Sequence, residues 1–410
     1  MILSDTRVPP PKTLQVALRK ITDTLAHALE NPTLPRPDWS DFEWVVAQAV
    51  AAMHGVSPLL SRSLLWNAPP GWTKFLENQR MHTARRYVRI NAMLQHINSR
   101  SAEAGIAALA LKGAALHAMG LYVGGERPMA DVDLLVRPQD AQMMARVLES
   151  LGFRQSAATW KERIFTPLAD HFPEDLGEHS DNDLKIELHD RICERLPWRL
   201  TEITADIFPI RPHAGLNDYS SKSSLMLHLL LHAAGSMPVK TLRLIQLHDI
   251  ALLSTRMTQA DWDLLLAYHS TAGRLWWAFP PLKLTSRYYP EKIPTYALTA
   301  LADECPRLLR KVALSTSLSD VSYSYLWVDA FPGVAWSQSI PEVIDYAINR
   351  LRPSAQHLAA REEIARSESW ARQDEWCRLS QARRIVRWIS SRPTRPVTMS
   401  VVSAALGKAQ

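Results

Sequence analysis

The sequence is poor in cysteine, with three residues in a chain of 410. Cys193, Cys305 and Cys377 lie far apart, no Cys-x-x-Cys pair occurs, and the count is odd. The cysteines therefore give no disulfide framework. We expect reduced thiols that are buried or take no part in function, in a reducing compartment.

The sequence also lacks a secretory leader and long hydrophobic runs. The first residues, MILSDTRVPPPK, contain no basic segment followed by an apolar one. The apolar run SLMLHLLLHAAGSM is short and is interrupted by histidine, so it does not suit a bilayer-spanning helix. We therefore expect no signal peptide and no transmembrane segment, and we take the cytoplasm as the default location.

Several catalytic signatures are missing. The chain has no GxxxxGK[ST] motif, which argues against a Walker-type kinase or ATPase, and no HExxH motif. A Ser-His-Asp or Cys-His signature cannot be identified either. The net charge of +6 and the pI of 9.2 are mildly basic. This charge suits an anionic ligand such as a nucleotide, but it does not by itself indicate a nucleic-acid-binding protein.

The chain has the composition of a globular protein, with 47% hydrophobic residues, and the spacing of its apolar residues changes twice along the sequence. Residues 1–104 repeat apolar positions at helical spacing, and Asp41 and Ser61 are candidate N-caps. Residues 105–215 alternate short strands and helices, and residues 216–410 return to helices. We predict an α+β fold: a small mixed sheet with flanking helices, between N-terminal and C-terminal helical regions.

The central part contains the stretch LKGAALHAMGLYVGGERPMADVDLLVRP. We expect a strand over residues 105–113, a short helix, a glycine-rich turn, and a second strand over residues 130–138. A helix follows over residues 139–153. A further strand is expected around Leu184–His189.

Asp131 and Asp133 lie one residue apart in the second strand. Side chains alternate across a strand, so both carboxylates point to one face, with their Cα atoms roughly 6–7 Å apart. Two carboxylates this close repel each other unless a positive charge lies between them. A divalent cation, Mg²⁺ or Mn²⁺, would meet this need. The alternative is an exposed strand end, because Asp-x-Asp is a common pattern.

Glu187 is the best candidate for a third carboxylate. Its strand alternates apolar residues with Lys185, Glu187 and His189, which share the other face. Three convergent carboxylates can hold two metal ions, one for an acceptor oxygen and one for the triphosphate. A solvent-facing position is the alternative for Glu187.

These motifs together resemble the bacterial uncharacterised nucleotidyltransferase family of the DNA polymerase β-like superfamily. The similar segments are LKGAAL, GERPMADVDLLVRPQD, LESLGF and IELHDRI, with weaker likeness in LHLLLHAA and LHDIALL. The resemblance implies a polymerase β-like fold and metal-dependent chemistry on a nucleoside triphosphate. It also implies Asp131, Asp133 and Glu187 as the acidic, metal-binding and catalytic positions.

Four more residues are candidates for contact with the nucleotide. The superfamily usually has Gly-Ser where this chain has Gly113 and Ala114, so phosphate binding would rest on backbone N–H groups near Gly113 and on Lys112. Arg127 can brace a carboxylate, bind phosphate, or form a structural ion pair. His189 can orient the neighbouring carboxylate, accept a proton, or simply pack.

The predicted function is transfer of a nucleoside monophosphate, most simply AMP, from a nucleoside triphosphate to an unknown acceptor. The acceptor can be a protein, a peptide, a small molecule or RNA. The first alternative is a kinase-like phosphotransferase on the same core, and the second is a binding or scaffold module that has lost catalysis.

Two features fall outside this core. The C-terminal helical region contains residues that suit a minor alternative, an HD-type phosphohydrolase metal site, although the same groups can cap or pair within helices: His228, His232, His248, Asp249, Asp261 and Asp263. Near the C-terminus an arginine-rich segment suits weak contact with RNA or an anionic surface, or is a solvated face. It contains Arg383, Arg384, Arg387, Trp388, Arg392 and Arg395.

Overall fold

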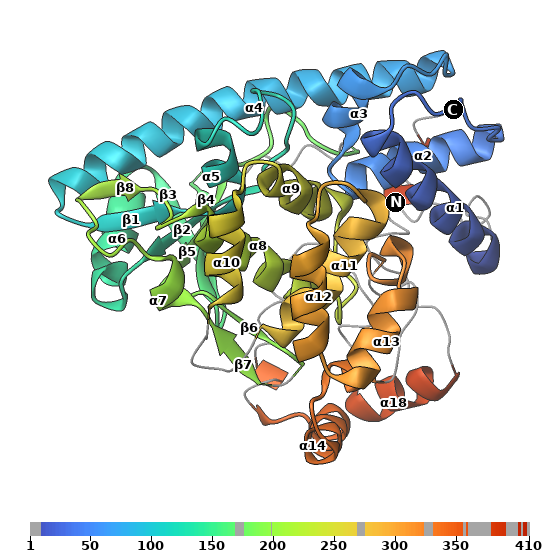
Figure 1. Ribbon diagram of the computed structural model, residues 1–410. Helices are drawn as coiled ribbons and strands as arrows, with labels where there is room; N and C mark the ends of the chain where they lie inside the picture. Colours follow the sequence, from blue (N-terminus) through green and yellow to red (C-terminus); the bar gives the residue numbers. More distant parts are fainter. Residues whose placement is uncertain are drawn as a thin grey trace.

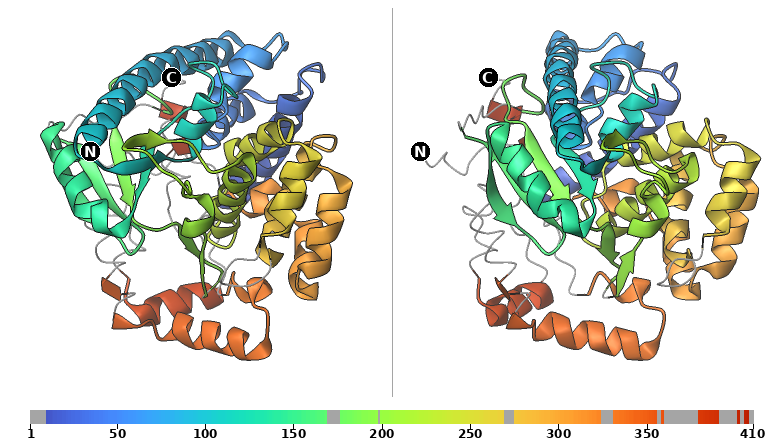
Figure 2. Two further views of the ribbon diagram at one scale, coloured as in Figure 1. Left: turned by 60° about the vertical axis from the view of Figure 1, so that its left-hand side comes forward. Right: turned by 90° about the vertical axis from the view of Figure 1, so that its left-hand side faces the viewer.

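A six-stranded mixed sheet lies at the centre of the chain, with helices on both of its faces (Figures 1 and 2). The computed structural model describes residues 10–168, 176–197, 199–268, 275–323, 331–355, 358–359, 379–390, 401–402 and 405–407. The fold is α+β, as predicted. The strand order is β3-β4-β5-β2-β1-β8. These strands are β1 (Ala107–Ala110), β2 (Asp131–Val136), β3 (Phe153–Ala158), β4 (Glu162–Pro167), β5 (Lys185–His189) and β8 (Gly215–Asn217).

The helices fall into groups before, within and after the sheet. Before it come α1 (Pro11–Glu30), α2 (Asp41–Met53), α3 (Ser57–Ser63) and α4 (Pro70–Glu103). Within it are α5 (Lys112–Ala118), α6 (Ala141–Ser150) and α7 (Thr204–Ile207), together with a small ribbon of β6 (Cys193–Arg195) and β7 (Leu200–Glu202). After it come α8 (Lys222–Ser236), α9 (Leu244–Ser254), α10 (Gln259–Leu266), α11 (Phe279–Tyr288), α12 (Thr295–Glu304), α13 (Arg307–Ser315), α14 (Ile340–Leu351) and α18 (Gln381–Ser390).

The two faces of β2 meet different cores. Val132, Leu134 and Val136 pack with residues of α4 and α6 in one buried cluster. Leu135, on the opposite face, joins a larger cluster that runs from α1 and α2 to α8, α9 and α11. Because residues alternate along the strand, Asp131 and Asp133 share the face of Leu135. The two carboxylates therefore face the C-terminal helices.

The expected boundaries between the three regions do not coincide with breaks in packing. The larger cluster joins the N-terminal helices, the sheet and the C-terminal helices. The expected boundary between residues 215 and 216 falls inside β8, which pairs in parallel with β1 through Asn217. The sheet therefore ends later than expected, and the separate domains stay a prediction.

Three local expectations were wrong or incomplete. The hairpin of β3 and β4 was missed, because β3 is mostly exposed and polar and its ladder contains a register shift. Ser40, rather than Asp41, caps α2 through a reciprocal pair with Glu43. Ser61, the other expected cap, lies inside α3.

Among the described residues, no single helix is long and apolar enough to cross a membrane. One sharply bent pair, α2 with α3, passes the same test by length and composition only. In α18, Arg384 is buried and its Nε donates to the carbonyl of Leu379, so it does not belong to an exposed basic face. Cys377, Arg392 and Arg395 lie outside the described residues, and contact with an anionic surface stays a prediction.

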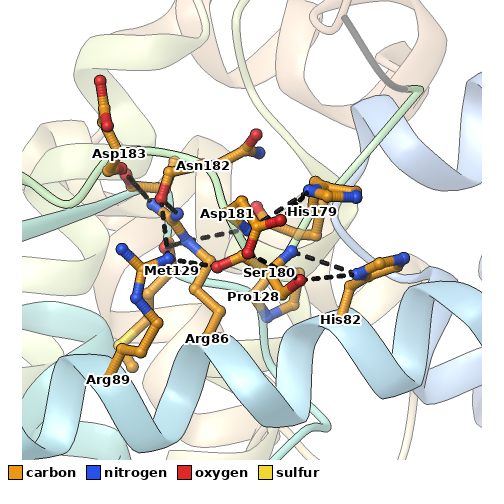
Figure 3. A network of polar contacts seen from close by, with 12 residues as sticks. His82, Arg86, Arg89, Pro128, Met129, His179, Ser180, Asp181, Asn182 and Asp183 are labelled. Atoms are coloured by element: carbon orange, nitrogen blue, oxygen red, sulfur yellow. Dashed lines mark hydrogen bonds and ion pairs between the residues drawn. The ribbon is translucent and has the colours of Figure 1, made fainter. Parts of the chain in front are cut away.

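Arg86 of α4 holds the beginnings of β2 and β5 together (Figure 3). Its guanidinium donates to the carbonyls of Met129 and Ala130, just before β2, at 3.1 and 2.9 Å. It also donates to the carbonyls of Asn182 and Asp183, before β5, at 2.6 and 2.9 Å. The residue is only 3% exposed. A single buried side chain thus fixes the relative position of the two strands that carry the acidic residues.

We predict that Arg86→Met lowers the free energy of unfolding by about 3–5 kcal/mol, because it leaves several buried carbonyls without a donor. Urea denaturation followed by circular dichroism measures the change. Arg85→Met is the matched control, since Arg85 is exposed on the same helix. Equal losses in the two variants would contradict the role assigned to Arg86.

Candidate functional site

The parallel pairing of β2 with β5 brings acidic residues from distant parts of the sequence together. Asp133 lies opposite Glu187 in the ladder, and Asp131 lies opposite Lys185. His189, two residues after Glu187, shares its face. Ligand atoms of Asp133, Glu187 and His189 all lie within 4.8 Å of one another. Within the described ranges this is the one group of three such side chains with the geometry to hold a metal ion.

The group differs in one member from the set predicted from the sequence. Asp131 was expected as a ligand, whereas His189 was expected to contact the nucleotide, orient a carboxylate, accept a proton or pack, and not to bind the metal. Asp131 nevertheless lies close to the group: burial, and then the charges of Asp133 and Glu187, raise the pKa of Asp131 to about 6. The three carboxylates outnumber the two ammonium groups that contact them, Lys112 and Lys185, and the role of Asp131 as a ligand stays a prediction.

Lys112 supplies part of the compensating positive charge. Its Nζ lies 2.9 Å from Oδ1 of Asp133, and Nε2 of His189 lies 3.1 Å from the same oxygen. Burial alone would raise the pKa of Asp133, but Lys112 and His189 hold it well below its usual value. Burial would likewise lower the pKa of Lys112, but Asp133, Asp131 and Glu187 raise it. Asp133 is therefore ionised and Lys112 is charged.

The backbone of Lys112 is in the left-handed region, with a φ of 43°. For a residue other than glycine this conformation costs of order 1–3 kcal/mol, and such strained residues cluster at functional sites. It falls at the first residue of α5, where the chain turns out of β1. The strained turn places the ammonium group beside the carboxylates.

The three clustered side chains fit a divalent cation. Carboxylate oxygens suit Mg²⁺ and Mn²⁺, and an imidazole nitrogen suits later transition metals, so the mixed donor set does not select one ion. Each of the two carboxylates in this group already contacts an ammonium group. Lys112 contacts Asp133, and Nζ of Lys185 lies 2.9 Å from Oε1 of Glu187. A bound cation would share these carboxylates with the two ammonium groups or displace them.

Gly113 and Arg127, both predicted to contact the nucleotide, pack against each other. A Cβ added to Gly113 would overlap Nη1 of Arg127, so the glycine makes room for the guanidinium. Arg127 itself forms a two-pronged pair with Asp249 of α9, at 2.8 and 2.7 Å, and the hydroxyl of Tyr122 donates to the same carboxylate. Arg127 thus forms a structural ion pair, which is one of the three roles that the sequence allowed for it. Phosphate contacts by Lys112 and Gly113 stay predictions.

A cavity of about 220 Å³ opens beside the clustered side chains. Lys112, Glu187 and His189 line one part of it, and its other walls come from the segment around β4, from β6 and from α8. The thiol of Cys193 also lines it, but burial raises the pKa of Cys193 to about 11, so this thiol is protonated and is a poor nucleophile.

The comparison with family models decides the family. The model for the uncharacterised nucleotidyltransferase family matches residues 40–290. The chain belongs to this family. The match covers the sheet and the helices from α2 to α11. Searches of curated proteins and of solved structures found no significant match.

Sequence reasoning missed four charged residues of the cavity, Lys161, Glu162, Arg191 and Glu194, and it considered two histidines only for a different site. Lys161 and Glu194 line it, but they lie in short segments with no motif. His228 and His232 were noted as an i, i+4 pair that suits a minor alternative, an HD-type site, yet they line the same cavity as Glu187. Their place in the cavity becomes clear only from the structure, which shows the direction in which α8 presents these side chains.

The HD-type site is not assembled by the described residues. Asp249 is taken up by Arg127, and Nδ1 of His248 lies 3.2 Å from the hydroxyl of Tyr289. Asp261 accepts from the backbone N–H of Thr258 at the start of α10. These polar groups therefore cap a helix or pair with neighbouring side chains, which was the other interpretation that the sequence allowed.

We predict that the Arg127–Asp249 pair stabilises the family fold rather than binding nucleotide. Arg127→Met or Asp249→Leu alone should cost about 3–5 kcal/mol in unfolding free energy, because each leaves a buried charge without its partner. The double variant should cost clearly less than the sum. Chemical denaturation of all three variants measures this coupling, with exposed Asp263→Asn as the control. Simple additivity would show that the pair is not a unit.

Proposed function

We propose that this protein transfers a nucleotidyl group, most simply AMP, from a nucleoside triphosphate to a hydroxyl group of an acceptor. The observation that carries the proposal is the parallel β2–β5 pairing, which gathers Asp133, Glu187 and His189 within 4.8 Å in a chain of the nucleotidyltransferase family. Such a cluster, beside a charged lysine and a cavity, suits chemistry on a phosphate.

Asp133, Glu187 and His189 would hold a divalent cation, with Asp131 beside them. When bound, the cation neutralises phosphate charge and makes the phosphorus easier to attack. Lys112 would approach the triphosphate as a point charge, since its Nζ already lies beside Asp133. The buried surroundings strengthen each of these electrostatic contacts.

In the proposed reaction the acceptor oxygen forms a bond to the α-phosphorus. The bond from the α-phosphorus to the bridging oxygen breaks, and pyrophosphate leaves with that electron pair. The proton of the acceptor hydroxyl passes to a carboxylate, for which Glu187 is our candidate because it lines the cavity. The protein forms no covalent intermediate and acts by positioning and charge neutralisation.

We also propose that the reaction takes place in the cytoplasm. Cys193 and Cys305 are buried free thiols, which suit a reducing compartment.

Isotope transfer from labelled triphosphates tests the proposal. The wild-type protein, with Mg²⁺ or Mn²⁺ and a cell extract as the source of acceptor, should transfer label from the α-position of ATP. Asp133→Asn and Glu187→Gln should each lower the rate at least about 100-fold, because each removes a charge from the site. Both should also weaken Mn²⁺ binding, measured by electron paramagnetic resonance.

Glu149→Gln is the control, because Glu149 is exposed on α6, which packs on the opposite face of the sheet. Transfer from the γ-position instead would identify a phosphotransferase. Absence of both nucleotide and metal binding would identify a scaffold module and reject the proposal.

A further inference from the structure

The cavity beside the clustered acids has a second end that the proposed reaction does not use. Its walls there carry Lys161, Glu194, His228 and His232. These residues come from the turn before β4, from β6 and from α8. They lie within the same 220 Å³ space as Glu187, which is our candidate to receive the proton of the acceptor.

Helix α8 is shaped to receive the carboxyl group of Glu194. His228, His232 and Gly235 follow one another at i, i+4 and i+7, so they share one helical face. A Cβ on Gly235 would lie 2.5 Å from Cδ of Glu194, so the carboxyl group rests where the helix carries no side chain. Glu194 Oε1 accepts from Nζ of Lys161 at 2.5 Å and lies 4.0 Å from Nδ1 of His232. Glu194 Oε2 has no donor among the described residues.

His228 lines the cavity, and we assign its Nε2 as a hydrogen-bond donor. The backbone N–H of Lys112 donates to the hydroxyl of Tyr219 at 3.3 Å, and the same hydroxyl lies 2.7 Å from Nδ1 of His228. We assign the proton of the hydroxyl to this second contact. Burial, and then the charge of Lys112, hold the pKa of His228 well below its usual value, so the ring is neutral. With Nδ1 accepting, the proton of the ring is on Nε2. No described residue accepts a hydrogen bond from that atom.

This end of the cavity therefore presents donors and acceptors in balance. The charged residues that line the whole cavity are three cations, Lys112, Lys161 and Arg191, and three carboxylates, Glu162, Glu187 and Glu194, so their formal charges cancel, and His228 carries no charge. Hydroxyl groups both donate and accept, so a molecule with several of them matches this lining. A phosphate would find no surplus positive charge there. A nucleobase would find no Phe, Tyr or Trp among the residues that line the cavity to stack on.

We infer that this end of the cavity is the acceptor subsite, and that the acceptor is a small, uncharged, hydroxyl-rich molecule such as a sugar or a polyol. The inference rests on the proposed nucleotidyl transfer and names its second substrate class. Glu194 and His228 bind hydroxyl groups of the acceptor and direct another hydroxyl toward Glu187. Lys161 and Gly235 position the carboxyl group of Glu194.

Gly235→Ala gives the sharpest test, because alanine is normally the better helix former. The added methyl group displaces Glu194 without removing a charge, so acceptor binding should fall while thermal stability is kept. Gly71→Ala is the matched control, since a Cβ on Gly71 meets no atom within 4 Å. His228→Leu removes the Nε2 donor, and His228→Gln, whose amide also donates, should restore part of the binding.

Two measurements are made on the full chain. Saturation-transfer NMR reports binding of D-glucose, D-ribose, myo-inositol and glycerol without metal or nucleotide, and calorimetry reports binding of Mn²⁺-ATP. At least one of the four compounds should bind to the wild-type protein. Gly235→Ala and His228→Leu should each weaken that binding about 5- to 10-fold, as expected for a lost hydrogen bond. Mn²⁺-ATP affinity should change less than about 2-fold.

Transfer of α-label from ATP to the same four compounds, to casein and to a short RNA completes the test. Label on a sugar or polyol supports the inference. Label only on casein or RNA, or no binding of any of the four compounds, overturns it while nucleotidyl transfer stands. Weakened Mn²⁺-ATP binding in the Gly235→Ala variant would instead make this end part of the nucleotide site. Sugar binding without any binding of Mn²⁺-ATP would reject the proposed function itself.

Discussion

The candidate site depends on one buried guanidinium. Asp133 and His189 meet across two parallel strands although they are 56 residues apart in sequence. Parallel strands have no hairpin turn to set their register, so the register must come from packing or from a third element. Arg86 of α4 supplies that element, because its donors bind the carbonyls just before each strand. A lysine has no planar fork with which to reach both strands at once.

With the register fixed, charge becomes the next constraint. Asp131, Asp133 and Glu187 face one side of the sheet, and the protein does not fully offset them. Lys112 and His189 act mainly on Asp133, whereas burial, and then the charges of Asp133 and Glu187, raise the pKa of Asp131. A structure that kept these carboxylates only for stability would be better served by apolar residues. The cluster is therefore better explained by a ligand that brings positive charge.

The sequence predicted the parts of this site that follow from local periodicity. Alternation along β2 and β5 placed the acidic residues on one face, and glycine and proline marked the ends of the elements. It did not predict contacts made by packing. Arg127 looks the same in sequence whether it binds phosphate or Asp249, and an i, i+4 histidine pair does not reveal what its face opposes. Lys161 contacts Glu194 because β6 brings the carboxyl group of Glu194 against Gly235, and no local sequence pattern predicts this arrangement.

The placement of α8 explains why the family likeness extends beyond the sheet. The family match continues to residue 290 and so includes α8 and α9. Helix α9 is tied to the segment before β2 through Arg127, and α8 closes the cavity that begins at Glu187. If the C-terminal helices only selected a substrate at a distance, the match would have no physical reason to include them. Helix α8 instead supplies part of the wall of the cavity beside Glu187. Under the proposed function, substitutions on this face of α8 would alter the acceptor subsite and leave the acidic cluster in place.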